Sequence, residues 1–157
     1  MLDLGPAQPS HLEIYSRFAR RIRFADLLGA PGREESWERA LGTLSGAPEK
    51  SFDVVLAWDL LDRISPKYRP VLMETLVRLT SSGARLHVLV DPSEKLTVPS
   101  VRFTLRDIRT VARRLSGDAQ PAWPPVMPAE VERMLRPFGV IHAFTLRSGY
   151  RAYVAER

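Results

Sequence analysis

Residues 51–91 constrain the fold of this chain most, because they contain two buried strands joined by one helix. Residues 52–57 form a nearly continuous apolar run, which is typical of a parallel strand covered on both faces. A helix is expected from Ser65 and Pro66 to the stop at Ser82 and Gly83. Its apolar side chains recur at helical spacing: Tyr68, Leu72, Leu76 and Leu79. A second buried strand, residues 86–90, completes a βαβ unit, which predicts a mainly parallel sheet.

An acidic residue follows each of these two strands. Asp59 ends the first strand and Asp91 ends the second. In open α/β sheets ligands collect at the carboxyl ends of the strands, so a site is expected in the loops around these two residues.

Composition bounds the class of protein. The chain has 157 residues, 45% of them hydrophobic, and is expected to form one domain over residues 1–157. No apolar run has the length of a membrane span and no signal-peptide pattern opens the chain. Zero cysteines exclude disulfides, thiol nucleophiles and thiolate metal sites, which fits a cytoplasmic protein.

Basic residues give a formal net charge of +5, and nearly all of them are arginines. They are spread evenly, apart from one group that would share a stripe of a helix: Arg102, Arg106, Arg109 and Arg113. We interpret this stripe as the solvated face of an amphipathic helix rather than as a phosphate-binding surface.

The N-terminal segment predicts a strand, a loop and a helix. Residues 1–5 have the pattern of a strand cut short at Met1, which suggests a natural chain that begins further upstream. Ser10 and Glu13 have the spacing of a capping box and predict the start of a helix. Its apolar face is expected to hold Ile14, Tyr15 and Phe18. Free N–H groups at this helix start would face the loop of residues 5–10.

Residues 21–26 alternate and end in Asp26, which predicts a second parallel strand. The next element is a helix at about residues 34–44, with Trp37, Ala40, Leu41 and Leu44 on one face. The loops on either side are rich in glycine and proline.

The C-terminal third predicts two helices and a hairpin. A helix is expected at about residues 105–115, and a proline-rich loop at 118–128 could act as a lid. A second helix is expected from Pro128 to Gly139. Two β-rich stretches around residues 147–149 predict an antiparallel hairpin.

This order of elements resembles the class I S-adenosylmethionine-dependent methyltransferases over essentially the whole chain. The resemblance implies an α/β, Rossmann-like fold with a mainly parallel sheet, helices on both faces and an antiparallel C-terminal hairpin strand. Asp3 and Gly5 match the start of the family's glycine-rich loop, whereas Ala7 and Pro9 stand at its second and third glycines. The family's third strand is not recognisable and is missing or reduced to a remnant near residues 39–44.

The same resemblance implies a set of cofactor contacts. Asp3, Gly5 and Ala7 would lie at the methionine part of S-adenosylmethionine, and Asp26 would accept hydrogen bonds from the ribose hydroxyls. Trp58 and Asp59 occupy the position after the fourth strand, where methyl donor and acceptor meet. Asp59 is a candidate general base there, and a carboxylate that caps the following loop or helix is an equal alternative.

The resemblance therefore favours methyl transfer to an unidentified acceptor, taken to be a small molecule. Ala7, Pro9 and the missing strand support an alternative, a non-catalytic methyltransferase-like module that binds a partner. An RNA-directed methyltransferase using the arginine stripe is a further alternative. Three histidines lack metal-ligand spacing, and the two strand histidines are interpreted as ordinary sheet residues: His11, His87 and His142.

Overall fold

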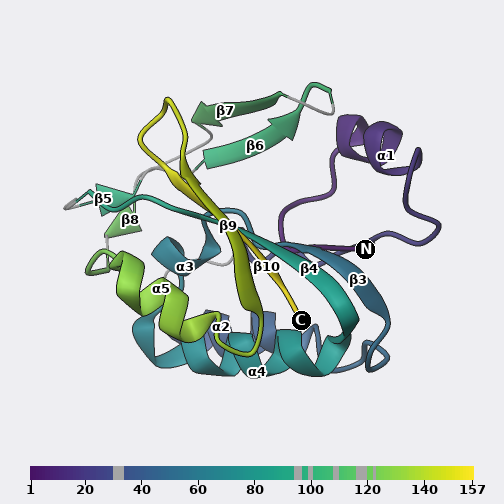
Figure 1. Cartoon of the computed structure of the whole chain (residues 1–157), viewed down its shortest axis with the longest axis horizontal. Helices are drawn as coiled ribbons and strands as arrows, with labels where there is room; N and C mark the ends of the chain where they lie inside the picture. Colours follow the sequence, from purple (N-terminus) through teal and green to yellow (C-terminus); the bar gives the residue numbers. More distant parts are fainter. Residues whose placement is uncertain (30–33, 94–96, 99–100, 108–109, 116–119, 122) are drawn as a thin grey trace.

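A six-stranded sheet forms the centre of the computed structural model (Figure 1). The structure describes residues 1–29, 34–93, 97–98, 101–107, 110–115, 120–121 and 123–157. The strands follow one another across the sheet in the order β2 (Arg23–Phe24), β1 (Leu2–Asp3), β3 (Phe52–Leu56), β4 (Thr80–Val90), β10 (Arg151–Glu156) and β9 (Gly139–Thr145).

The first four strands of this order are parallel and the last two are antiparallel. β1 pairs in parallel with both β2 and β3, and β3 pairs in parallel with β4. β10 is antiparallel to β4 and to β9, so the expected terminal hairpin is confirmed. The chain leaves β1 for β2 on one side and returns to β3 on the other, which makes the β1–β3 junction a topological switch point. Along the chain, the described residues form no strand after β2 and before β3, in agreement with the missing third strand.

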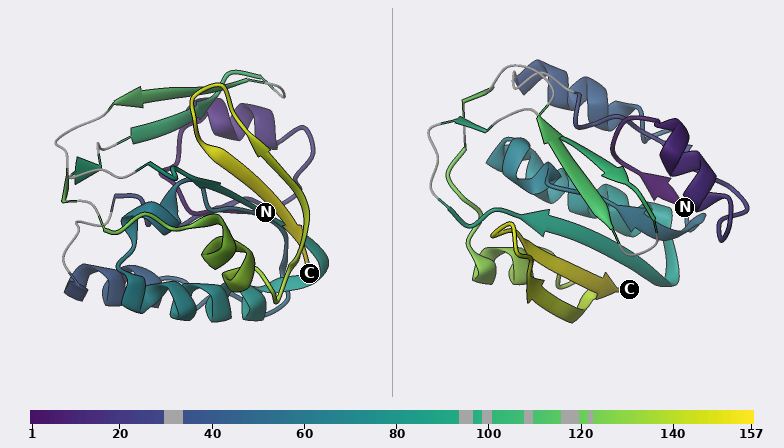
Figure 2. Two further views of the ribbon diagram at one scale, coloured as in Figure 1. Left: turned by 60° about the vertical axis from the view of Figure 1, so that its left-hand side comes forward. Right: turned by 90° about the horizontal axis from the view of Figure 1, so that it is seen from above.

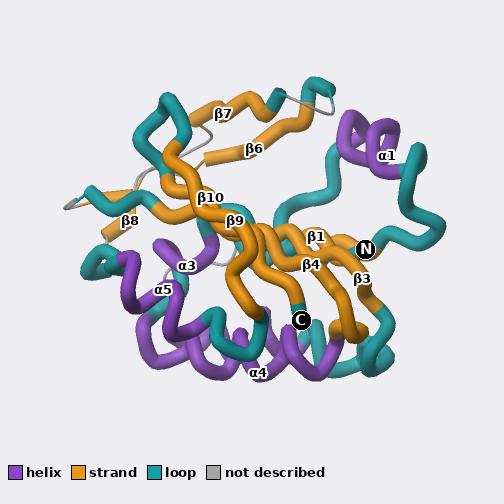
Figure 3. Tube along the Cα trace, viewed as in Figure 1, coloured by secondary structure: helices purple, strands orange, loops and turns teal. Residues whose placement is uncertain are grey.

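Helices cover both faces of the sheet (Figures 2 and 3). In the view of Figure 1, α2 (Glu34–Gly42), α4 (Arg69–Leu79) and α5 (Pro128–Met134) lie below the sheet. On the other side are α1 (Pro9–Tyr15) and a separate two-stranded sheet of residues 101–105 and 111–115. The fold class expected from the sequence is therefore confirmed.

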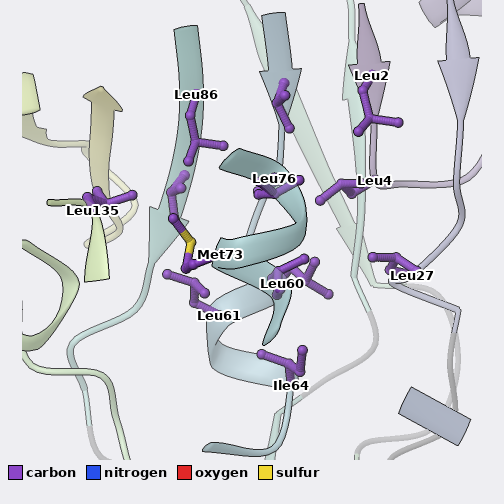
Figure 4. Packing of buried hydrophobic residues seen from close by; sticks show 14 of the residues in the cluster. Leu2, Leu4, Leu27, Leu60, Leu61, Ile64, Met73, Leu76, Leu86 and Leu135 are labelled. Carbon is purple, nitrogen blue, oxygen red and sulfur yellow. The ribbon is translucent and has the colours of Figure 1, made fainter. Parts of the chain in front are cut away.

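The main core lies between the sheet and α4. Figure 4 shows Met73 and Leu76 of α4 close to Leu86 of β4, with Leu60 and Leu61 beside them. All five side chains are buried, and each contributes roughly 2 kcal/mol by leaving water. Because this packing requires apolar side chains at these positions, the βαβ unit can be predicted from their spacing in the sequence.

The helical part of that unit differs from the expectation in its ends. Helical structure starts with the short α3 (Leu60–Arg63) directly after Asp59, followed by a 3₁₀ turn, η1 (Pro66–Tyr68), that runs into α4. The predicted stop at Ser82 and Gly83 is wrong, because Thr80 already pairs with Phe52 and opens β4. Extended pairing with a neighbouring strand overrides the local stop signal.

The predicted capping box at the start of α1 is also wrong. The N-cap is Gln8 and the helix begins at Pro9, whose fixed φ and missing N–H suit a first helical position. Phe18, expected on the apolar face, lies beyond the helix and is 61% exposed.

The helix expected at 105–115 is wrong, because this segment forms a β-hairpin. β6 (Val101–Leu105) pairs antiparallel with β7 (Val111–Leu115). Arg102 and Arg114 are opposite one another in this pairing, whereas Arg109 lies outside the described residues. The helical arginine stripe does not form, which removes the observation that motivated an RNA-directed enzyme.

The remaining elements follow the expected order. α2 is confirmed, with Trp37 and Leu41 buried, and α5 ends at Met134, five residues before the predicted stop. In the proline-rich segment 118–128, residues 118, 119 and 122 lie outside the described part. β8 (Gln120–Pro121) pairs there with β5 (Thr97–Val98). None of the described helices has the length and apolarity needed to cross a membrane.

Candidate functional site at the switch point

The carboxyl ends of β1, β2 and β3 meet at one edge of the sheet. Asp3 ends β1, Asp26 follows β2 and Asp59 follows β3, and these strands are neighbours and parallel. Their ends are tied together by backbone bonds, in which Leu4 N–H donates to Leu56 O at 3.0 Å and Leu27 N–H donates to Leu4 O at 2.9 Å. The structure thus brings the three predicted aspartates to the edge at which the doubly wound rule places a site.

Asp3 is fully buried, and both oxygens of its carboxylate accept hydrogen bonds from the protein. Oδ1 accepts from Gly5 N–H at 2.8 Å and from Trp58 Nε1 at 2.6 Å. Oδ2 accepts from the Tyr15 hydroxyl at 2.7 Å, and His11 Nδ1 lies 3.4 Å away. Burial and the charge of Asp3 raise the pKa of Tyr15, which keeps its hydroxyl a donor. A buried carboxylate with this many donors is stable as an acceptor within the fold.

Trp58 is held in an unusual backbone conformation. Its φ is +49°, in the left-handed region that costs a residue with a side chain about 1–2 kcal/mol. The indole is 2% exposed and lies between two rings, His11 at 5.8 Å and Phe103 at 5.3 Å between centroids. The Phe103 ring is nearly parallel to it, with 5° between planes. Packing and the bond to Asp3 offset the backbone cost.

Gly5 allows this close approach. A Cβ at position 5 would lie 3.2 Å from Trp58 Nε1 and 3.2 Å from Asp3 Oδ1. The glycine expected to leave room for a cofactor therefore makes room for the indole in this structure. Ala7, the next residue of the predicted loop, is exposed.

The β6–β7 hairpin is fastened to the start of α1 over this edge. Gln8 Nε2 donates to Phe103 O at 2.8 Å, and Gln8 Oε1 accepts from the Thr104 hydroxyl at 2.9 Å. His11 Nε2 accepts from Leu105 N–H at 3.2 Å, which assigns the ring proton to Nδ1, on the side of Asp3. The hairpin, Trp58 and α1 form one connected unit.

Asp26 and Asp59 have opposite environments. Asp26 is exposed, and its Oδ1 accepts from Gly29 N–H at 2.9 Å. Asp59 is 1% exposed, and both of its oxygens accept from Arg63, at 2.9 and 2.6 Å. Asp26 thus offers an accessible acceptor, whereas Asp59 holds an arginine of α3 in a bidentate pair.

Two residues that contact Asp3 had no assigned role in the sequence, Tyr15 and His11. The sequence predicts Tyr15 on the apolar face of a helix and gives His11 no role, because the three histidines lack metal-ligand spacing. Their spacing of four residues within one helix was the available signal, because it places both side chains on the same face. No pattern in the sequence named Asp3 as the target of that face.

Comparisons with known proteins give matches only at the level of structure. No family model matches the sequence, and no curated protein matches it. Solved structures match over nearly all of the chain at low sequence identity.

Three of these structures show the range of similar proteins. The 1,6-didemethyltoxoflavin-N1-methyltransferase of Burkholderia thailandensis, solved with bound 1,6-didemethyltoxoflavin and S-adenosylhomocysteine, is 17% identical with a TM-score of 0.52. The match covers 99% of this chain and 59% of that one. An S-adenosylmethionine-dependent methyltransferase of Mesorhizobium loti is 14% identical (TM-score 0.56; 99% and 89% covered). The cyclase SpnF is 16% identical (TM-score 0.62; 99% and 74% covered).

All three structures share the overall fold of this chain at 17% sequence identity or less. SpnF is named a cyclase, so this fold supports more than one chemistry. The chain therefore has the fold of the class I S-adenosylmethionine-dependent methyltransferases.

Proposed function

We propose that this protein binds S-adenosylmethionine at the switch-point edge and transfers its methyl group to a small-molecule acceptor. The observation that supports this most is the position of Asp26, an exposed carboxylate at the end of β2, one strand from the switch point. In a doubly wound sheet this is the position from which a carboxylate reaches a ribose.

The residues at the ribose end fit the cofactor. Asp26 Oδ2 accepts no hydrogen bond from the described residues, and Oδ1 is oriented by Gly29 N–H. A Cβ at position 29 would lie 2.9 Å from Oδ2, so glycine keeps this side of the carboxylate open. Two carboxylate oxygens suit the two adjacent hydroxyl donors of a ribose.

The residues at the methionine end do not fit it in this conformation. Asp3 is buried under its own donors, and the indole of Trp58 lies against Gly5. We infer that Trp58 moves away from Gly5 when the cofactor enters, because the contacts of Trp58 close this end of the site in the present conformation. The strained φ of Trp58 lowers the cost of that movement, because leaving the left-handed region releases strain.

The chemistry of the reaction asks little covalent help from the protein. S-adenosylmethionine supplies an activated methyl group, so the chain's task is to orient the partners and exclude water. Phe103 and the hairpin that carries it shield the edge, and Arg63 fixes α3 beside it through Asp59. Both oxygens of Asp59 are bonded to Arg63 and neither makes a capping hydrogen bond to the backbone of α3. Asp59 is therefore better suited to positioning α3 through Arg63 than to capping the helix or taking a proton, and this positioning role is the one we propose.

A non-catalytic methyltransferase-like module is the second candidate. The hydrogen bonds from Trp58 and Tyr15 to Asp3 favour it, since a permanently closed edge would leave the fold only its surfaces for function. Calorimetric titration with S-adenosylhomocysteine separates the two. We expect binding by the wild type and a loss of about tenfold or more in Asp26→Asn, because the amide replaces one ribose acceptor by a donor.

Asp53→Asn is the matched control. It removes the same charge from an exposed aspartate of β3 that bonds to Ser81. Equal weakening in both variants would contradict a ribose contact by Asp26.

A further inference from the structure

A cavity of about 470 Å³ lies beside Trp58, away from the residues assigned to the ribose. Three parts of the fold line it: β4, the β6–β7 hairpin and the β9–β10 hairpin. It is distinct from the Gly5 loop and Asp26, neither of which lines it. Trp58 belongs to both places, since its Nε1 bonds to Asp3 while its side chain forms part of the cavity wall.

The interior of the cavity is aromatic. Phe103 stacks on Trp58, and Tyr150 meets Phe103 edge to face at 6.2 Å and 88°. His87 meets Trp58 edge to face at 6.2 Å. Trp58, Phe103 and Tyr150 are each no more than 5% exposed. Because Phe103 and His11 cover the faces of Trp58, a planar ring in the cavity would meet the edges of these buried rings and the ring of Phe144, a lining residue that is 50% exposed.

The mouth of the cavity is basic. Arg113 and Arg147 are exposed residues of its lining, and the described lining residues include no aspartate or glutamate. The Arg113 guanidinium lies 5.5 Å from the centroid of the Tyr150 ring, which holds the cation at the edge of the aromatic interior. Guanidinium groups bind carboxylates through paired N–H donors.

His87 supplies a polar group without charge. Burial lowers the pKa of His87 to about 4, so the ring is neutral at pH 7. Its Nδ1 is buried without a hydrogen-bond partner among the described residues. The sequence predicts an ordinary sheet histidine at this position, whereas the structure places His87 in the cavity wall.

We propose that this cavity binds a planar aromatic carboxylate, with the ring against Trp58, Phe103 and Tyr150 and the carboxylate at Arg113 and Arg147. That this ligand is the methyl acceptor rests on the proposed function. The binding itself rests only on the rings, the two cations and the absence of acidic residues from the described lining.

The test uses 2-naphthoate as the probe and 2-naphthalenemethanol, its neutral analogue, as the comparison. Both are titrated into the full chain without cofactor and followed by calorimetry. Naphthoate is expected to bind more tightly than the alcohol. Arg113→Gln is expected to lower the affinity for naphthoate by roughly fivefold, because one cation at the mouth is lost. The affinity for the alcohol should not change.

Arg102→Gln is the matched control, since Arg102 is an exposed arginine of the same hairpin that does not line the cavity. Equal loss in Arg113→Gln and Arg102→Gln, equal affinity for acid and alcohol, or no binding of naphthoate would overturn the proposal. Unchanged melting temperatures exclude misfolding as the cause of any loss.

Titration of S-adenosylhomocysteine into the same preparation separates this proposal from the proposed function. If naphthoate binds and S-adenosylhomocysteine does not, the cavity proposal is supported, but the cavity has no role as a methyl-acceptor site. If S-adenosylhomocysteine binds and naphthoate does not, the cavity proposal is overturned and the proposed function stands.

Discussion

The indole Nε1 of Trp58 donates a hydrogen bond of 2.6 Å to Oδ1 of Asp3, across 55 positions of sequence. This contact joins the ends of β1 and β3 at the switch point and brings the indole onto Gly5. It explains why Trp58 tolerates a left-handed backbone and why the edge is closed in this structure.

Backbone strain at position 58 predicts that a glycine there is more stabilising than an alanine, the reverse of the usual order. Trp58→Ala is expected to lower the free energy of unfolding by about 4 kcal/mol through lost packing. Trp58→Gly is expected to be about 1 kcal/mol more stable than Trp58→Ala, because glycine adopts positive φ without strain. Urea unfolding measures both. Ala57→Gly, at a neighbouring buried residue without positive φ, is the control and should be destabilising.

The donors around Asp3 predict a large effect of a small change. In Asp3→Asn the amide group would face N–H and O–H donors, so at least one buried donor loses its acceptor. The free energy of unfolding should fall by about 3 kcal/mol. The exposed Asp53→Asn is expected to change it by no more than about 0.5 kcal/mol. Similar effects of the two changes would show that the Asp3 network adds no stability.

The buried imidazole of His87 predicts a pH dependence of stability. Its pKa is lowered by burial from 6.5 to about 4, so the unfolded chain binds the proton more tightly than the folded chain. Stability from this group is present above pH 6.5 and is lost as the pH falls towards 4. Between pH 7 and pH 5 the wild type should lose about 2 kcal/mol more than His87→Gln. His142→Gln removes an exposed imidazole of the same sheet and serves as the control.

The two hydrogen bonds of Gln8 predict that α1 holds the hairpin in place. Gln8→Ala removes the bonds to Phe103 and Thr104 and should cost about 1–2 kcal/mol locally. Amide exchange of residues 101–105 is expected to become about tenfold faster, with little change at the centre of β4. Ser16→Ala removes a hydroxyl that, among the described residues, donates only to Glu13 O at the end of α1, and it should leave exchange in the hairpin unchanged.

The sheet was predictable because its signals are local. The apolar runs of β3 and β4 and the helix between them have distinct periods, and the hairpin signal at residues 147–149 stands between two β-rich stretches. The acidic residues after β1 and β2 do not give the register of this pair, because Asp3 pairs with Phe24, two residues before Asp26.

The hairpin β6–β7 was missed because its apolar residues fit two periods. Leu105, Val111 and Leu115 match a helical face, although Val101, Phe103 and Leu105 alternate as in a strand. Pairing between the two strands favours the hairpin over a helix, and the spacing of apolar residues within one segment does not show that pairing.

The closed edge could not be predicted, because it depends on partners that are distant in sequence. The family resemblance implies that Asp3 and Trp58 both lie near the cofactor, but nothing in either segment indicates that Trp58 donates a hydrogen bond to Asp3. A positive φ at a tryptophan has no sequence signal, since it arises from the packing of His11 and Phe103 around the ring.

The affinity of S-adenosylhomocysteine for Trp58→Gly, compared with wild type, tests the central claim most directly. If the indole closes a cofactor site, its removal abolishes the cost of opening, and calorimetry should show binding by both proteins with an affinity up to about tenfold higher in the variant. Absence of binding by both proteins at millimolar ligand, with the variant still folded, would contradict the account.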